Sequence, residues 1–248
     1  MSEAPKALRA DKFLVTQGYF ETRTQAQAAI KAGKVRINGW VLKKASMLLT
    51  VDDAVKAGRV HPWASRGGLK LDHALKSFHV DVEGMTALDV GASTGGFTDV
   101  LLTRGALKVY AVDVGHDQLH DKLKSDPRVV SREGQDAREI TADMFSPLPD
   151  IIVCDASFIS ATKVLDAALD IAASGTKLIT LVKPQFEVGR AGIGRGGIVK
   201  SKNLADQALS DVSTWISSKN WQVLETLDSP IKGGSGNAEF LLYAMKLG

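Results

Sequence analysis

A glycine-rich run at residues 89–98, Asp-Val-Gly-Ala-Ser-Thr-Gly-Gly-Phe-Thr, has the residue types and spacing to hold a nucleotide-like ligand. It follows a predicted strand and opens a predicted helix, where glycines let the backbone turn tightly and approach a ligand closely. The spacing of Gly91 and Gly96 matches a phosphate-binding P-loop, but Phe97 replaces the lysine that neutralises the phosphates. Ser93 stands where a dinucleotide fingerprint needs its second glycine. The run therefore disfavours both triphosphates and dinucleotides.

Carboxylates near this run suit an adenosyl ligand. Asp113 ends the next predicted strand, about 20 residues after the loop, where a carboxylate can accept hydrogen bonds from ribose hydroxyls. Asp136 follows the third strand and could accept from an adenine amine, although either residue could instead be a helix cap. The combination resembles the cofactor site of class I methyltransferases, which bind S-adenosyl-L-methionine. The predicted cofactor-binding residues are Asp89, Gly91, Ser93, Gly95, Gly96, Phe97, Asp113 and Asp136.

The residues after the fourth predicted strand disfavour a base as methyl acceptor. Amino-group methylases usually have Asn/Asp-Pro-Pro-aromatic there, whereas this chain has Asp-Ala-Ser-Phe at 155–158. Methylation at carbon 5 of cytosine would need a cysteine nucleophile. The single cysteine, Cys154, lies at the apolar end of the strand and is better explained as core packing.

Five motifs give a more specific resemblance, to the TlyA family of ribosomal RNA 2′-O-methyltransferases with an FtsJ-type catalytic domain, and the similarity covers nearly the whole chain. The motifs are Ser-Arg-Gly-Gly-Leu-Lys-Leu at 65–71, the run at 89–98, Asp-Ala-Ser-Phe-Ile-Ser at 155–160, Val-Lys-Pro-Gln-Phe-Glu at 182–187 and Ser-Gly-Asn-Ala-Glu at 235–239. The resemblance implies a ribosomal RNA or ribosomal-subunit partner and a catalytic tetrad of Lys70, Asp155, Lys183 and Glu239. Because the chain ends soon after its last predicted strand, we expect large-subunit cytidine as the target.

The chemistry of ribose methylation explains why such a tetrad is useful. A protonated 2′-hydroxyl is a poor nucleophile, so transfer needs a base, or a cation that stabilises the developing oxyanion. We assign this role to Lys183. The second ammonium of Lys70 and partial burial would favour loss of its proton, whereas the carboxylates of Asp155 and Glu239 would orient the lysines and oppose that loss. The sequence leaves this balance open, and a structural network of salt bridges is the alternative.

Charge is distributed unevenly along the chain. Residues 1–60 hold 11 Lys and Arg against five Asp and Glu, whereas the remainder holds 20 against 23. Excess positive charge at one end suggests binding of a polyanion, although a solvated surface would also explain it.

The first 60 residues are predicted to form two short helices followed by a hairpin, and the first helix is expected to include Leu8, Phe13, Leu14 and Val15. The run at 33–39, Gly-Lys-Val-Arg-Ile-Asn-Gly, ends in a strong two-residue turn, and residues 40–42 can return as the partner strand. With residues 9–14 and 22–26, this pattern resembles the RNA-binding module of a small-subunit ribosomal protein, many pseudouridine synthases and a family of RNA methyltransferases. A purely structural module is the alternative. The predicted RNA-binding residues are Arg9, Lys12, Arg23, Lys34, Arg36 and Lys43, together with Arg66.

The remaining residues alternate between strand-like and helix-like segments, which predicts a doubly wound α/β sheet, as in a class I methyltransferase with a Rossmann-like fold. We expect a small α+β RNA-binding domain at 1–60, a linker at 61–68 and the methyltransferase domain at 69–248. The predicted strands are 86–90, 108–113, 128–131, 150–154 and 177–182, followed by an antiparallel pair at 222–227 and 239–245.

Other features of the sequence limit the range of possible functions. A single cysteine fits a reducing compartment, and no stretch approaches the length of a spanning helix, so we expect a cytoplasmic protein that needs no membrane.

His116 and His120 are spaced to share one face of a predicted helix, but we expect a surface pair and no metal site. Residues 189–197 are rich in glycine and contain Arg190 and Arg195, which favours an RNA-contacting lid over a simple connector. No oligomer is implied.

Three rival functions follow from the same sequence. A membrane-active haemolysin is a label attached to relatives of this family, and the lack of spanning segments opposes it. A non-catalytic RNA chaperone would not require the glycine run or the tetrad. A pseudouridine synthase would share the front module but has no need of a nucleotide-like glycine turn.

Overall fold

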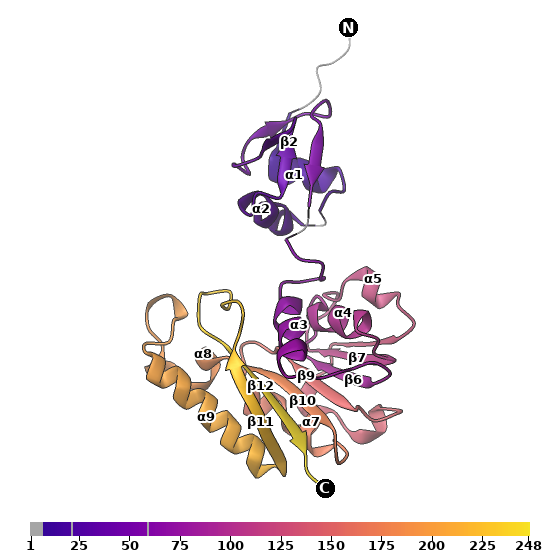
Figure 1. The fold of residues 1–248 in the computed structure, drawn as a ribbon, viewed down its shortest axis with the longest axis vertical. Coiled ribbons are helices and arrows are strands. Elements are labelled where there is room, and N and C mark those ends of the chain that lie inside the picture. The colour runs from indigo at the N-terminus through magenta and orange to yellow at the C-terminus, as the bar shows by residue number, and fades with distance from the viewer. Residues whose placement is uncertain (1–6, 21, 59) are drawn as a thin grey trace. The chain divides into compact units, whose positions relative to one another are not determined.

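The structure is a computed structural model of the chain, and it describes residues 7–20, 22–58 and 60–248. The chain divides into two compact units, Met1–Pro62 and Trp63–Gly248 (Figure 1). Gly67 and Gly68, predicted within the linker, form the first turn of a helix in the second unit. Each unit has its own hydrophobic core.

The first unit is a small α+β module. Its elements are β1 (Leu8–Arg9), α1 (Ala10–Thr16), α2 (Arg23–Lys31), β2 (Val35–Ile37), β3 (Trp40–Val41), β4 (Leu48–Leu49) and β5 (Val55–Ala57). Thr22 caps α2 by accepting from the Gln25 N–H, and the predicted hairpin pairs β2 with β3. Leu8 was expected in the first helix, but it forms β1, which pairs with β4. The first helix starts two residues later, and the return strand stops at Val41.

The second unit has a seven-stranded sheet that confirms the predicted doubly wound fold. Its strands are β6 (Thr86–Val90), β7 (Lys108–Asp113), β8 (Val129–Glu133), β9 (Ile151–Cys154), β10 (Lys177–Val182), β11 (Trp221–Asp228) and β12 (Phe240–Lys246). They lie in the order β11-β12-β10-β9-β6-β7-β8. The five strands from β10 to the edge strand β8 are parallel, whereas β12 is antiparallel to both β10 and β11, which confirms the predicted antiparallel end.

Helices cover both faces of this sheet because side chains alternate along its buried strands. Leu88 and Val90 of β6 join one core cluster, whereas Ala87 joins the other. The first cluster includes residues of α6 (Ala161–Val164), α7 (Asp166–Asp170) and α9 (Lys202–Ser218), and the second includes residues of α3 (Gly67–Ser77), α4 (Gly96–Thr103) and α5 (Asp121–Lys124). The remaining short elements are α8 (Pro184–Glu187), η1 (Ala137–Glu139), η2 (Ala142–Met144), η3 (Arg190–Gly192) and η4 (Arg195–Gly197).

Two local predictions about helices are wrong. His116 and His120 do not share a helix, because residues 114–117 form a bend, Asp117 has a φ of +52°, and α5 begins only at Asp121. The connection from β8 to β9 contains the 3₁₀ turns η1 and η2 in place of an α-helix. In the second connection, Ile140 and Thr141 have extended backbone conformations and separate η1 from η2.

Candidate active site

The predicted motifs meet at one edge of the sheet in the second unit. β9 pairs in parallel with both β6 and β10, so their carboxyl ends lie side by side. Val182 ends β10 and pairs with Phe240, which begins the antiparallel β12. Asp155, Lys183 and Glu239 therefore emerge at the same edge. The strand order also reverses between β6 and β9, and open α/β sheets bind ligands at such a switch point.

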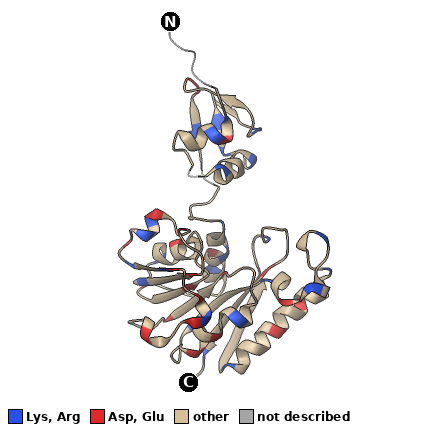
Figure 2. Cartoon of the chain, turned by 180° about the vertical axis from the view of Figure 1, so that it is seen from behind, with Lys and Arg blue, Asp and Glu red and all other residues tan. Residues whose placement is uncertain are grey.

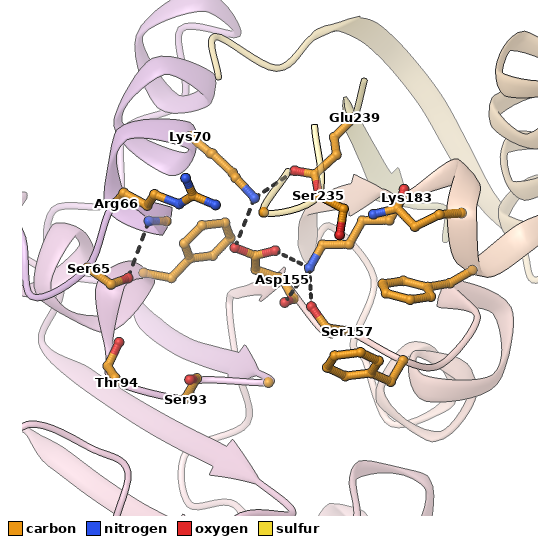
Figure 3. Close-up of a pocket in the computed structure, with 18 of the residues that line it drawn as sticks. Ser65, Arg66, Lys70, Ser93, Thr94, Asp155, Ser157, Lys183, Ser235 and Glu239 are labelled. Atoms are coloured by element: carbon orange, nitrogen blue, oxygen red, sulfur yellow. Dashed lines mark hydrogen bonds and ion pairs between the residues drawn. The ribbon is translucent and has the colours of Figure 1, made fainter. Parts of the chain in front are cut away.

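The four residues of the predicted tetrad form one continuous chain of ion pairs (Figure 3). Glu239 Oε2 lies 2.7 Å from Lys70 Nζ, which lies 3.5 Å from Asp155 Oδ2. The other carboxylate oxygen of Asp155 lies 2.6 Å from Lys183 Nζ. Lys70, Lys183 and Glu239 are buried, and buried charges are tolerated when they are paired and hydrogen-bonded. The signs alternate along the chain, so each charge lies next to an opposite one.

Three oxygen atoms surround the ammonium group of Lys183. Besides the Asp155 carboxylate, Nζ donates to the Asp155 backbone carbonyl at 3.0 Å and to Ser157 Oγ at 2.7 Å. A lysine ammonium has three N–H donors and no acceptor, and these three neighbours are all oxygen atoms. Ser157 was not singled out in the sequence, because a serine in a loop has no pattern that marks it as a lysine partner.

Two glycines bring the backbone close to the carboxylates of the tetrad. A Cβ atom added at Gly67 would lie 3.2 Å from Asp155 Oδ2. One added at Gly233 would overlap the carboxylate of Glu239. Side chains at these positions would displace the carboxylates, so the geometry of the tetrad requires glycine at Gly233 and favours it at Gly67.

A cavity of about 620 Å³ lies between the tetrad and the glycine-rich loop. It is lined by all four tetrad residues and by loop residues 91–94, 96 and 97. Arg66 and Ser235 also line it, and Figure 3 shows their side chains near the tetrad. Cations, hydroxyls and a glycine-rich wall in one cavity suit a polar, anionic ligand.

An aromatic pair, of which Phe158 is exposed and Phe186 is partly buried, forms part of the wall of this cavity. Phe158 is 92% exposed, and its ring centroid lies 5.4 Å from that of Phe186. Phe158 also has a φ of +67°, a region that bulky residues rarely adopt. An exposed phenylalanine in a strained conformation at a cavity indicates a function, and its flat face can stack on a nucleobase. Both residues belong to motifs of the sequence, and no role was predicted for either.

A second cavity, of about 560 Å³, lies on the other side of the same loop. Asp113, Asp136, Gln118 and Gln135 line it, and it shares Ser93 with the first cavity. The two cavities also share Gly91, Asp155, Ser157 and Phe158. One elongated ligand could therefore occupy the second cavity and place its reactive end beside the tetrad.

The two aspartates of the second cavity already hold polar groups of the protein. Asp113 accepts from the backbone N–H of Ser93 at 2.8 Å and of Gly115 at 2.7 Å, so it fixes the glycine-rich loop. Asp136 accepts from the Arg138 N–H and pairs with its guanidinium, which lowers the pKa of the carboxyl. Each carboxylate has further lone pairs available, so capping and ligand binding are compatible roles.

Two predicted cofactor residues, Asp89 and Gly95, line neither cavity. Asp89 is fully buried beneath the loop and accepts from Thr98 Oγ1 at 2.7 Å. Burial raises the pKa of its carboxyl to about 7. Gly95 has a φ of +88° at the start of α4, and a Cβ there would overlap Leu123. Gly91 does line both cavities, and its Cβ would lie 2.9 Å from the Ala156 Cα, so glycine there permits close packing of two loops.

Comparison with known proteins agrees with this architecture. Residues 63–246 match the family model described as FtsJ-like methyltransferase, and residues 8–55 match the S4 domain. The chain is 40% identical over 237 residues to Hemolysin A of Brachyspira hyodysenteriae, covering 95% of this chain and 99% of that one. It is 41% identical over 242 residues to the 16S/23S rRNA (cytidine-2′-O)-methyltransferase TlyA of Mycobacterium tuberculosis, covering 95% and 88%. The chain belongs to the TlyA family of FtsJ-like methyltransferases.

A solved structure supports the same assignment over both units. The chain matches a protein of Streptococcus thermophilus named as a hemolysin, with 42% identity and a TM-score of 0.77, covering 98% of this chain and 90% of that one. The predicted family, the fold and the methyltransferase class are thereby confirmed. The first unit is an S4 domain, as the resemblance to an RNA-binding module implied.

The predicted RNA-binding residues of the S4 domain are all exposed, and Figure 2 shows few acidic residues there. Two of them are not isolated cations. Arg9 and Arg23 both contact the buried carboxylate of Asp11, at 3.1 and 2.7 Å. The hydrogen bond from Arg9 contributes most to lowering the pKa of this carboxyl well below its usual range. Arg36 pairs across the sheet with Lys56, a further cation that was not among the predicted RNA-binding residues.

The part of the chain that the structure describes holds no group of three or more His, Cys, Asp or Glu arranged to bind a metal. Within the same residues, no helix is both long enough and apolar enough to cross a membrane.

Cys154 is buried in the core, and burial raises the pKa of its thiol to about 12. This environment fits the packing role that was predicted for it.

Proposed function

We propose that this protein transfers a methyl group from S-adenosyl-L-methionine to the ribose 2′-hydroxyl of a cytidine in ribosomal RNA, with large-subunit RNA as the main substrate. The observation that carries the proposal is the ion-pair chain of Lys70, Asp155, Lys183 and Glu239, which lines a cavity beside the glycine-rich loop. The name of the Mycobacterium tuberculosis relative, which is 41% identical, supports the same reaction.

The residues of the two adjoining cavities fit this cofactor. The carboxylates of Asp113 and Asp136 line the second cavity and can accept hydrogen bonds from ribose hydroxyls and from an amine. Ser93 and Gly91 line both cavities, so a ligand there could reach from these carboxylates to the tetrad. The bound cofactor supplies an electrophilic methyl group on a sulfonium.

Lys183 is the group that we assign to the acceptor oxygen. Its ammonium form can stabilise the negative charge that develops on the 2′-oxygen as the hydroxyl gives its proton to solvent water and the methyl group moves from the sulfonium, which leaves as a thioether, to that oxygen. A 2′-oxygen could take the place of Ser157 Oγ as a hydrogen-bond acceptor of Nζ. We therefore assign Lys183 to the stabilisation of charge and not to proton abstraction, a choice that the sequence left open.

The other three members of the tetrad hold Lys183 in place. Asp155 contacts it directly and also contacts Lys70, which in turn binds Glu239. Two cations and two anions give the group no net charge, so the lysines can remain buried without an unpaired ion. Orientation of Lys183 by fixed charges avoids reorganisation when the acceptor arrives.

We assign RNA binding to the exposed cations of the S4 domain and to Arg66 at the acceptor cavity. Lys and Arg neutralise backbone phosphates and supply most of the affinity for a structured RNA. The exposed ring of Phe158 provides a surface on which the base of the target nucleotide can stack. With this substrate, the protein would act in the cytoplasm on ribosomal subunits or their RNA.

A transfer assay tests the proposal directly. The purified protein is incubated with methyl-labelled S-adenosyl-L-methionine and with separated small and large ribosomal subunits, and 2′-O-methyl positions are then mapped. We expect label on a cytidine ribose of the large subunit. Absence of transfer to both subunits, or a methyl group found on a base, would rule out the proposed function. Label on the small subunit alone would overturn the choice of large-subunit RNA.

A further inference from the structure

The segment at residues 189–200, called here the strap, forms part of the wall of the acceptor cavity. It runs from the end of α8 to the start of α9 and places Ile193 and Gly197 in the cavity lining. Gly189, Gly196 and Gly197 have φ values of +65°, +71° and +77°, conformations that suit glycine. A glycine-rich segment loses much conformational freedom when it closes, so its closed form depends on the contacts that hold it.

One buried side chain, that of Asn237, holds the strap at two points. Its Oδ1 accepts from the Val199 N–H at 2.9 Å, and its Nδ2 donates to the Gly197 carbonyl at 2.8 Å. Asn237 is only 3% exposed, so both amide atoms are used away from bulk water. A group that both donates and accepts is needed here, which a carboxylate or a hydrocarbon side chain cannot supply.

The same residue also supports the catalytic carboxylate. The backbone carbonyl of Asn237 accepts from the Gly233 N–H at 2.9 Å. Gly233 in turn lies so close to the Glu239 carboxylate that a Cβ atom there would overlap it. Glu239 binds Lys70 at 2.7 Å and so begins the ion-pair chain. Strap, asparagine, glycine and glutamate are thus in continuous contact.

We propose that Asn237 is a positioning residue that latches the strap over the acceptor cavity and, through Gly233, sets the carboxylate of Glu239 for methyl transfer. The latch makes closure of the strap and alignment of the tetrad one event. Release of the latch lowers the rate of transfer more than it weakens binding of the cofactor, because Asn237 does not line the second cavity. The kinetic part of this inference rests on the proposed function, whereas the closure of the strap can be measured without it.

The alternative is that Asn237 is needed only for the local turn to fold. Loss of the side chain would then lower global stability without exposing the strap selectively, and any loss of activity would follow the loss of folded protein. Two observables separate the cases, namely backbone hydrogen exchange of the strap in the folded protein and the split between kcat and KM.

The test uses substitutions on both sides of the latch. Asn237→Ala removes both hydrogen bonds, and Asn237→Asp keeps the acceptor for Val199 but cannot donate to Gly197. Val199→Pro removes the N–H donor on the strap and leaves Asn237 intact. Asn203→Ala, an exposed position on α9 just after the strap, is the control. Each protein is examined by hydrogen exchange, by binding of S-adenosyl-L-methionine and by transfer to large-subunit RNA.

We expect Asn237→Ala to speed exchange of strap amides roughly tenfold or more while amides of β6 and β9 stay protected. We also expect kcat to fall roughly tenfold, with cofactor affinity unchanged, and Asn237→Asp to lie in between. Val199→Pro should reproduce the effect of Asn237→Ala. The double variant should change strap exchange and kcat little more than either single substitution does. If Asn237→Ala fails to fold, Val199→Pro decides the question.

Three results would overturn the inference. These are unchanged strap exchange in the folded Asn237→Ala and Val199→Pro variants, an unchanged kcat in both, or the same changes in Asn203→Ala. If the unsubstituted protein transfers no methyl group to any ribosomal RNA, the proposed function fails. The exchange measurement still decides whether Asn237 holds the strap closed.

Discussion

Lys70 and Glu239 lie 169 positions apart in the sequence, yet Lys70 Nζ donates to Glu239 Oε2 at 2.7 Å. The pair joins the first helix of the methyltransferase domain to the residue before its last strand. Both side chains are buried, so neither charge has water as a substitute partner. The pair therefore contributes to the fold as well as to the geometry of the site.

Removing one member of this pair should destabilise the protein strongly. Lys70→Met leaves the Glu239 carboxylate buried without its cation, and breaking a buried pair in this way costs about 3–5 kcal/mol. The double variant Lys70→Met with Glu239→Leu removes both charges and should cost less than the sum of the two single changes. Urea unfolding gives the free energies. Single variants within about 0.5 kcal/mol of the unsubstituted protein would contradict a stabilising pair.

The sequence predicted the parallel sheet and the motifs at its edge because each central strand is a short apolar run bounded by turns. Val182 was predicted as the end of one strand and Glu239 as the start of another. The antiparallel pairing of β10 with β12, which places Val182 opposite Phe240, was not predicted. All four tetrad residues were assigned through family resemblance, and Lys70 has the weakest signal of its own, since a lysine on an amphipathic helix is usually exposed. Its burial depends on contacts that are distant in the sequence.

The features that the sequence did not predict depend on short elements or on single backbone conformations. β1 and β4 contain two residues each, too few to show a period, so Leu8 was assigned to a helix. The positive φ of Phe158 carries no sequence signal, because it is not a glycine or an asparagine. The side-chain amide of Asn237 is ordinary in sequence and becomes significant only through its two partners on the strap.

Replacement of Lys183 should abolish transfer without affecting the cofactor. Lys183→Ala removes the ammonium from the acceptor cavity but leaves the second cavity, which it does not line, unchanged. We expect a loss of kcat of at least about 100-fold, with cofactor affinity close to that of the unsubstituted protein. Lys177→Ala, at the opposite end of β10, is the matched control and should retain activity. Activity retained in Lys183→Ala would exclude Lys183 as the essential group.

Loss of the Phe158 ring should weaken RNA binding and relieve backbone strain. Phe158→Gly removes a stacking surface worth about 1–3 kcal/mol per base, so KM for RNA should rise roughly tenfold. The same change places glycine at a φ of +67°, so thermal stability should not fall. Leu107→Ala, which also removes an exposed apolar side chain, is the control for both measurements. An unchanged KM in Phe158→Gly would show that no base stacks there.

The buried thiol of Cys154 should be unreactive in the folded protein. Burial raises its pKa to about 12, so almost none of it is thiolate at neutral pH, and the thiolate is the reactive form. A disulfide reagent such as Ellman's should label the protein only after unfolding in urea. Rapid labelling of the native protein would show that this strand end opens to solvent. Cys154→Ala should retain methyl transfer, because the thiol lines neither cavity.

Burial of Asp89 beneath the glycine-rich loop should make stability depend on pH. Its pKa is about 7 in the folded protein, against 3.8 for an ordinary aspartate, so the folded state favours the protonated form. At pH values below about 4 the group is protonated in both states, and its contribution to stability is fully present. As pH rises through about 7 that contribution is lost, because the unfolded chain holds the ionised carboxylate more favourably.

Asp89→Asn keeps an acceptor for Thr98 and cannot ionise, so it isolates this effect. Urea unfolding of both proteins between about pH 4.5 and 8 gives the comparison, since other titrating groups cancel in the difference. We expect the unsubstituted protein to lose stability relative to Asp89→Asn as pH rises across this range. Parallel curves would mean that Asp89 titrates as an ordinary carboxyl, and a difference of the opposite sign would mean that its ionised form is stabilised beneath the loop.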